Sequence, residues 1–216
     1  MVPIVSFIGY HDSGKTTLAA GVVRCLKERG YRVAVIKSTK ERGIPFDRPG
    51  TDTHTHRQAG ADAVTLVAPD QMVIFSGPLD MEIAQLAKRF FPGMDIIIAE
   101  GFKHAPGIAK IEVTTGGEPL LRDQVEGVVA VVSDAPVRGV LFGRDDTAQV
   151  ADFIEQRFLR NPGKKEEKLV LLVNGRKLTL NGFVQEALAG TITGFVRTLQ
   201  DSGEAREIEI RIRLDR

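Results

Sequence analysis

The chain has 216 residues, which corresponds to one domain of typical size plus about 60 further residues. Its 29 Lys and Arg against 28 Asp and Glu leave a net charge of +1, so we expect no diffuse basic surface for nucleic acid or anionic lipid. The hydrophobic content of 43% is that of a globular protein, and the lone Cys25 excludes an internal disulfide. No apolar run approaches the ~20 residues that span a bilayer, and no secretory signal is visible. We therefore expect a cytoplasmic protein that binds neither membrane nor nucleic acid.

Strand-like and helix-like patterns alternate over the first 160 residues. Ile4–Ile8 predicts a buried strand, a glycine-rich loop follows it, and Leu18 begins an amphipathic helix that Gly30 ends. Further strands are expected at Arg32–Lys37, Ala63–Val67, Ile96–Ala99 and Val128–Val132, and helices at Thr53–Ala59, Met81–Phe91 and Ala148–Leu159. This alternation predicts an α/β fold of the P-loop NTPase type, with a mostly parallel, doubly wound sheet and flanking helices.

The composition changes after Arg160. Residues 161–167 form a polar run with Pro and Gly, which we interpret as a linker between a domain at 1–160 and a module at 168–216. In that module, two short strands flank Asn174-Gly175, a dipeptide typical of hairpin turns. A helical apolar stripe then runs from Phe183 to Leu199, and apolar residues alternate from Ile208 to Leu214. This order predicts a small ββαβ module, for which an interaction or dimerisation role is expected because one sheet face and an edge stay available.

Residues 9–16 match the phosphate-binding pattern G-x-x-x-x-G-K-[ST] between a predicted strand and a predicted helix. Glycines let the loop wrap an anion at the positive end of the helix dipole. Lys15 is expected to bridge the β- and γ-phosphates, the Thr16 hydroxyl to bind Mg²⁺, and Thr17 to reach the α-phosphate. The expected nucleotide contacts are Gly9, Tyr10, His11, Asp12, Ser13, Gly14, Lys15, Thr16 and Thr17.

A carboxylate is expected as the second protein ligand of Mg²⁺, beside Thr16, and two residues are candidates. Asp95 precedes the predicted strand Ile96–Ala99 and Glu100 follows it. Ligands of α/β sheets bind beyond the carboxyl ends of the strands, so Glu100 is the better metal and catalytic candidate and Asp95 a strand-start cap. In the long segment before Thr53, Asp47 is a candidate metal ligand and Asp52 a candidate catalytic group, although Asp52 fits the N-cap of the next helix equally well.

Asp134 lies just past the strand Val128–Val132. One carboxylate accepts both the N1–H and the N2 amine of guanine, a pair that adenine lacks, so Asp134 is a candidate for selecting GTP over ATP. An ordinary Ser-Asp-Ala-Pro turn is the alternative. The chain's 4 histidines lie in scattered positions that do not predict a zinc site.

Short motifs follow the phosphate loop in a fixed order, at residues 36–37, 47–52, 57–61, 100–104, 108–111 and 133–136. Together they resemble the molybdopterin-guanine dinucleotide biosynthesis protein B family over residues 1 to about 160. The resemblance implies a protein that binds GTP and Mg²⁺, has weak GTPase activity and is usually dimeric. It also implies action beside the guanylyltransferase that joins GMP to molybdopterin, with other molybdenum cofactor biosynthesis proteins as partners and molybdopterin as a candidate ligand. It favours Asp134 as the guanine contact and Glu100 as the metal partner.

Two other functions remain open from the residues. The same loop supports a small-molecule kinase with Asp47 or Asp52 as the base, although no arginine-rich lid is visible in the sequence. The third hypothesis is an adaptor that uses nucleotide to order a partner surface, with negligible turnover.

Overall fold

The structure is a computed structural model that describes residues 2–78, 80–160, 169, 171–173, 176–199, 208–210 and 212. The chain separates into two compact units, Val2–Arg160 and a C-terminal unit that begins at Asn161. The predicted linker at 161–167 lies outside the described residues.

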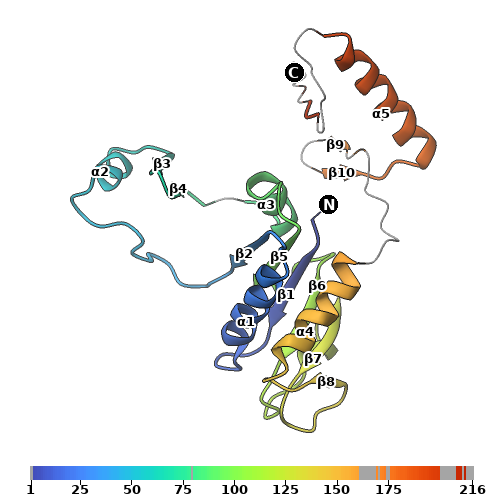
Figure 1. Ribbon diagram of the computed structural model, residues 1–216. Helices are drawn as coiled ribbons and strands as arrows, with labels where there is room; N and C mark the ends of the chain where they lie inside the picture. Colours follow the sequence, from blue (N-terminus) through green and yellow to red (C-terminus); the bar gives the residue numbers. More distant parts are fainter. Residues whose placement is uncertain are drawn as a thin grey trace. The chain divides into compact units, whose positions relative to one another are not determined.

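A six-stranded sheet forms the centre of the first unit, with the order β2-β5-β1-β6-β7-β8 (Figure 1). Its strands are β1 (Ile4–Ile8), β2 (Val33–Lys37), β5 (Ile96–Glu100), β6 (Ala109–Val113), β7 (Val128–Val132) and β8 (Val140–Phe142). Every neighbouring pair is parallel. The predicted α/β fold with a parallel sheet is therefore confirmed, and all six strands end at one edge of the sheet.

Helices cover both faces of this sheet. α1 (Lys15–Glu28) and α4 (Thr147–Ile154) pack on one face and α3 (Ile83–Phe90) on the other (Figure 1). The first four residues of β5 are apolar because both faces of the strand are covered: Ile96 and Ile98 pack on the α1 side, whereas Ile97 and Ala99 pack on the α3 side. A π-helical turn, η2 (Glu155–Leu159), continues α4.

The segment between β2 and α3 holds a separate hairpin. β3 (Ala63–Val67) pairs antiparallel with β4 (Met72–Ser76), and α2 (Asp52–Gln58) precedes them. The sequence-based prediction that Ala63–Val67 joins the main sheet is therefore wrong. An apolar run of five residues fits a buried parallel strand and a hairpin strand equally well. The strand with which it pairs decides between the two, and the run itself does not show which strand that is.

Three strands of the first unit are absent from the sequence-based expectations: β4, β6 and β8. β6 carries the charged residues Lys110 and Glu112 within its five residues, which hides its apolar pattern. Both are nevertheless buried, at 2% and 1% exposure. A 3₁₀ turn, η1 (Leu121–Asp123), follows β6, and its backbone binds the Glu112 carboxylate.

In the C-terminal unit, β9 (Leu171–Val173) pairs antiparallel with β10 (Arg176–Leu178), and α5 (Gly182–Arg197) follows. Asn181 caps α5 by accepting a bond from the N–H of Val184. The predicted turn Asn174-Gly175 and residues 211, 213 and 214 of the predicted last strand lie outside the described residues, and residues 208–210 and 212 are described without strand structure.

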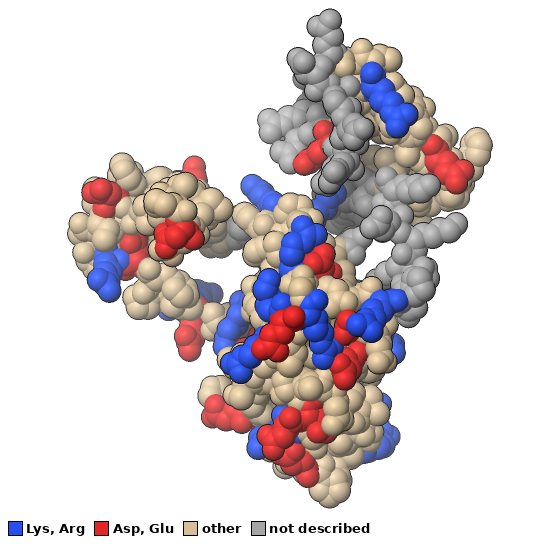
Figure 2. All heavy atoms as spheres, in the orientation of Figure 1, with Lys and Arg blue, Asp and Glu red and all other residues tan. Residues whose placement is uncertain are grey.

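Basic and acidic side chains are interspersed over the face of the first unit shown in Figure 2. Among the described residues, no helix is long and apolar enough to cross a membrane.

Candidate nucleotide site

The carboxyl ends of three neighbouring strands bring the candidate residues together. β1 leads into the phosphate loop, while Lys37 and Glu100 are the last residues of β2 and β5 and face each other in register. Because β5 lies between β2 and β1, the loop and both charged residues meet at one edge of the sheet.

Two glycines are required by the geometry of the loop. A Cβ at Gly9 would collide with the carbonyl oxygen of Val113 on β6. Gly14 has a φ of 88°, a conformation that costs other residues energy, and it lies immediately before α1. The loop is thereby positioned at the positive end of the α1 dipole, as anion binding needs.

Lys15, the first residue of α1, extends its side chain back over the loop. Its Nζ donates to the carbonyl oxygen of Tyr10 and lies 3.2 Å from Oγ of Ser13. Burial lowers the pKa of Lys15, while the charges of Glu100 and Asp12 oppose this shift. The ammonium is therefore held by groups of the phosphate loop itself.

Thr16 and Glu100 form the second part of the site. The Thr16 hydroxyl lies 2.8 and 2.9 Å from the two carboxylate oxygens of Glu100. Lys37 Nζ lies 2.8 Å from Oε1 of the same carboxylate. The structure thus joins two of the three residues expected to bind the metal, Asp47 being the third, and adds a second ammonium that the sequence-based prediction did not include.

The charge state of Glu100 follows from these contacts. Burial would raise its pKa, but the bonds from Lys37 and Thr16 and the charges of Lys37 and Lys15 outweigh that effect. The pKa of Glu100 therefore lies below its usual range, and the side chain is an anion at neutral pH.

The other acidic candidates lie in different surroundings. Asp95 accepts bonds from the backbone N–H and the guanidinium of Arg32, at the amino ends of β2 and β5. Asp47 accepts from Thr51, Thr53 and Arg57, so its hydrogen bonds all stay within its own segment. Thr51 is the N-cap of α2, and Asp52 is the exposed first residue of the helix rather than its cap. The contacts of Asp47 do not extend to Thr16 or Glu100.

Asp134 lies two residues past β7, beside the loop that follows β8. Its carboxylate accepts two bonds from Arg144, one from the backbone N–H and one from Nε, both at 2.8 Å. These bonds lower the pKa of Asp134, the backbone bond first and then the side-chain bond and the charge. Arg144 is a second residue that the sequence-based prediction did not include.

The remaining polar residues of the loop are solvent-exposed. His11 Nδ1 lies 2.8 Å from Asp12 Oδ2, and both side chains are about nine-tenths exposed. Among the described residues, no three His, Cys, Asp or Glu side chains form a group that would hold a metal by themselves. Metal binding at Thr16 and Glu100 would therefore depend on ligands from phosphate and water, which is how Mg²⁺ is usually held in nucleotide sites.

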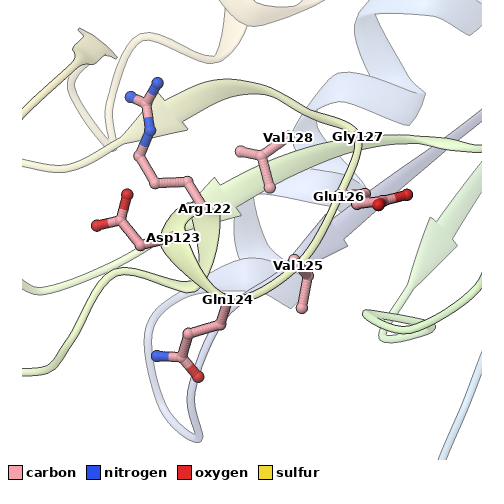
Figure 3. Close-up of a pocket in the computed structure, with 7 residues that line it drawn as sticks. All are labelled: Arg122, Asp123, Gln124, Val125, Glu126, Gly127 and Val128. Carbon is pink, nitrogen blue, oxygen red and sulfur yellow. The ribbon is translucent and has the colours of Figure 1, made fainter.

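A shallow depression lies elsewhere, along residues 122–128. Figure 3 shows its labelled side chains pointing away from one another, with Arg122 and Asp123 on one side and Glu126 on another. Its one link to the phosphate loop is Gln124, whose Nε2 lies 3.5 Å from the Tyr10 hydroxyl. Because its polar groups do not converge on one point, this depression is not a ligand site of comparable quality.

The sequence-based prediction did not include Lys37 and Arg144 among the site residues, for a different reason in each case. Lys37 ends an apolar strand, which is a usable signal, but its partner becomes evident only when β5 is placed beside β2. Arg144 belongs to a short loop after the three-residue strand β8, which the sequence pattern does not reveal.

The parallel sheet, the glycine loop between β1 and α1, and the Thr16–Glu100 pair define a protein of the P-loop NTPase type. Comparison with known proteins narrows this class. The family model "Molybdopterin guanine dinucleotide synthesis protein B" (MobB) matches residues 4–134. The chain belongs to the MobB family, and so to the proteins of molybdenum cofactor biosynthesis.

Individual relatives agree with this assignment. The "molybdopterin-guanine dinucleotide biosynthesis adapter protein" of Escherichia coli K12 is 34% identical over 175 residues, covering 76% of this chain and 97% of its own. A crystal structure of "molybdopterin-guanine biosynthesis protein B (mobB)" is 30% identical with a TM-score of 0.57, covering 71% of this chain and 97% of its own. A Methanocaldococcus jannaschii relative is 25% identical over 232 residues and covers 97% of both chains. Its likeness therefore extends into the C-terminal unit.

Proposed function

We propose that this protein binds Mg²⁺·GTP at the phosphate loop, hydrolyses it slowly, and acts as an accessory protein in the attachment of GMP to molybdopterin. The observation that carries the proposal is the contact of Thr16 with Glu100 directly beside the phosphate loop. It places a hydroxyl and a carboxylate together, the hard oxygen donors that Mg²⁺ prefers.

The residues of this chain divide the work of binding GTP. The loop amides and Lys15 neutralise the β- and γ-phosphates, Thr16 and Glu100 orient the metal, and Lys37 supplies further positive charge at the same edge. A bound Mg²⁺ would withdraw charge from the phosphate oxygens. Glu100 is an anion at neutral pH and is also available to hold a water molecule beside the γ-phosphate.

Slow turnover suits these groups. Arg144, the arginine of the site, already binds the Asp134 carboxylate. Fast phosphoryl transfer usually needs an arginine that reaches the transferred phosphate, often from a partner protein. A weak GTPase that acts mainly as an adaptor is therefore the proposed activity, with Asp134 selecting guanine.

The proposed partners are the molybdopterin guanylyltransferase, other proteins of molybdenum cofactor biosynthesis, and molybdopterin as a bound ligand. Membership of the MobB family and the adapter name of the E. coli relative support these partners. A cytoplasmic location is also part of the proposal.

We also propose a homodimer that forms through the β3–β4 hairpin. Apolar side chains of this hairpin are exposed by 49% at Leu66, 73% at Val67 and 63% at Met72. An isolated two-stranded hairpin is at best marginally stable in water, and each strand of this hairpin has one edge that pairs with no other strand among the described residues. A second copy of the hairpin would supply both the missing strands and an apolar cover.

Equilibrium binding of GTP to the Lys15→Ala variant tests the nucleotide site. We expect affinity to fall about 100-fold or more, since charged hydrogen bonds to two phosphates are lost. The matched control is Lys88→Ala, which removes an exposed lysine from α3 and leaves binding unchanged. Equal affinity of wild type and Lys15→Ala would refute the site. Co-purification of the guanylyltransferase with and without GTP then tests the accessory role.

A further inference from the structure

The bonds between Asp134 and Arg144 have a specific form. Oδ1 of Asp134 accepts from the Arg144 backbone N–H and Oδ2 from its Nε, each at 2.8 Å. Each carboxylate oxygen has two lone pairs, so this arrangement uses about half of the accepting capacity of Asp134. The other half remains for the N1–H and N2 amine of a guanine base.

The loop that carries Arg144 is anchored on both sides. Before it, the N–H of Ser133 donates to the carbonyl of Phe142 and joins the end of β7 to β8. Within it, the Gly143 N–H donates to Oδ2 of Asp146 at 2.8 Å. After it, Thr147 packs so closely on α1 that a Cβ at Gly21 would lie 2.6 Å from its Cγ2. The Arg144 backbone is therefore held in place relative to α1, the helix that begins at the phosphate loop.

The Arg144 side chain extends from Asp134 to the phosphate loop. Its Nη1 lies 3.8 Å from the position that a Cβ on Gly14 would occupy. A nucleotide with its phosphates on the loop and its base edge on Asp134 would have to pass along the Arg144 side chain, which lies between these two places. A base bound to Asp134 would lie beside the flat guanidinium, and guanidinium groups stack favourably on aromatic faces.

We propose that Arg144 is a base-contacting residue of the nucleotide site: its guanidinium covers one face of the guanine, while its backbone N–H orients the Asp134 carboxylate that binds the base edge. The inference rests on the proposed binding of GTP. In this proposal the Arg144 side chain contributes affinity for any purine, whereas Asp134 selects guanine. The backbone N–H of residue 144 orients Asp134, and every side-chain variant at this position keeps that N–H.

The alternative is an ordinary surface ion pair, because the side chains of Arg144 and Asp134 are 42% and 57% exposed. Such pairs contribute little to stability and nothing to nucleotide binding. The chain offers a matched control in Arg138, whose guanidinium pairs with Asp123 and whose side chain is also exposed.

The test compares the affinities of wild type, Arg144→Ala, Arg144→Lys and Arg138→Ala for GTP, GDP and ITP, which lacks the N2 amine. We expect Arg144→Ala to weaken all three about tenfold and to leave the ratio of GTP to ITP affinity unchanged. Arg144→Lys recovers only part of the loss because an ammonium lacks the planar stacking surface. Arg138→Ala binds like wild type, and equal thermal unfolding of all variants shows that the fold is intact.

Two results overturn the proposal, and they are distinguishable. If wild type binds GTP and Arg144→Ala binds it equally well, Arg144 has no role while the proposed function stands. If wild type binds no guanine nucleotide at all, both fail together.

Discussion

Lys37 Nζ lies 2.8 Å from Oε1 of Glu100, and the two residues end adjacent parallel strands in register. Thr16 holds the same carboxylate from the phosphate loop. Lys37 thus neutralises the charge of the proposed metal ligand.

This ion pair predicts a pH dependence. Burial alone would raise the pKa of Glu100, yet Lys37 and Thr16 lower it below the usual value of about 4.3. A lowered pKa keeps the carboxylate ionised as the pH falls, until the pH passes that lowered value. Lys37→Ala removes a bond and a charge, so the pKa of Glu100 rises and protons compete with Mg²⁺ at a higher pH.

The measurement is Mg²⁺-dependent GTP affinity between pH 4.5 and pH 8, chosen to lie at and above the usual glutamate pKa of about 4.3. We expect wild type to keep its affinity further into the acid range than Lys37→Ala. The control is Lys40→Ala, which removes an exposed lysine three residues further along the chain. Identical pH profiles for wild type and Lys37→Ala would contradict the assigned pairing.

Glu100→Gln isolates the contribution of the carboxylate charge. The amide keeps the size and one acceptor of the side chain but cannot supply an anionic metal ligand. We expect the GTP affinity of Glu100→Gln in excess Mg²⁺ to be about tenfold lower than that of wild type. The ratio between its affinities in Mg²⁺ and in EDTA should also be smaller than for wild type. Asp95→Gln at the opposite end of β5 leaves the Mg²⁺ dependence unchanged, because its carboxylate binds Arg32. A full Mg²⁺ dependence in Glu100→Gln would exclude Glu100 as the metal partner.

Replacing Glu112 is expected to destabilise the fold. Its carboxylate is 1% exposed and accepts the N–H groups of Leu121 at 2.6 Å and Arg122 at 2.9 Å. Glu112→Ala leaves the buried N–H of Leu121 and the half-buried N–H of Arg122 without this partner and is expected to lower the free energy of unfolding by about 3 kcal/mol. Denaturant unfolding measures this loss, with the exposed Glu118→Ala as a control close to zero. A loss under 1 kcal/mol for Glu112→Ala, which is about the net value of one ordinary hydrogen bond, would contradict the prediction.

A charge placed on the β3–β4 hairpin is expected to weaken the proposed homodimer. Val67 is 73% exposed on β3, and a lysine there would bring an unpaired charge into the proposed dimer contact. We expect Val67→Lys to raise the dimer dissociation constant about 100-fold while GTP affinity stays that of wild type. Light scattering across a dilution series measures the change. Phe90→Lys places the same charge on α3, at a side chain 39% exposed, and should dimerise normally. A Val67→Lys protein that dimerises like wild type would exclude the hairpin as the contact.

One part of the proposed nucleotide site can be predicted from local sequence patterns, and another part depends on the order of the strands in the sheet. The strand Ile4–Ile8, the loop and the following helix are contiguous, and their apolar spacing and glycines are sufficient to predict them. Glu100 was likewise predictable, because parallel strands end at one edge of the sheet.

Lys37 and Arg144 depend on longer-range arrangement. Lys37 meets Glu100 only because β5 inserts between β2 and β1, an order that no local pattern encodes. Arg144 reaches Asp134 through the pairing of β7 with the short strand β8. The hairpin β3–β4 was misassigned for the same reason, since burial of Ala63–Val67 depends on its partner and not on its composition.

The most direct test of the proposed nucleotide site is a calorimetric titration of the wild-type protein with GTP and with ATP, each in Mg²⁺ and in EDTA. We predict saturable GTP binding that weakens in EDTA, and ATP binding at least tenfold weaker because adenine lacks the adjacent N1–H and N2 amine donors that Asp134 would accept from guanine. Equal binding of ATP and GTP, or GTP binding that is indifferent to Mg²⁺, would contradict the account.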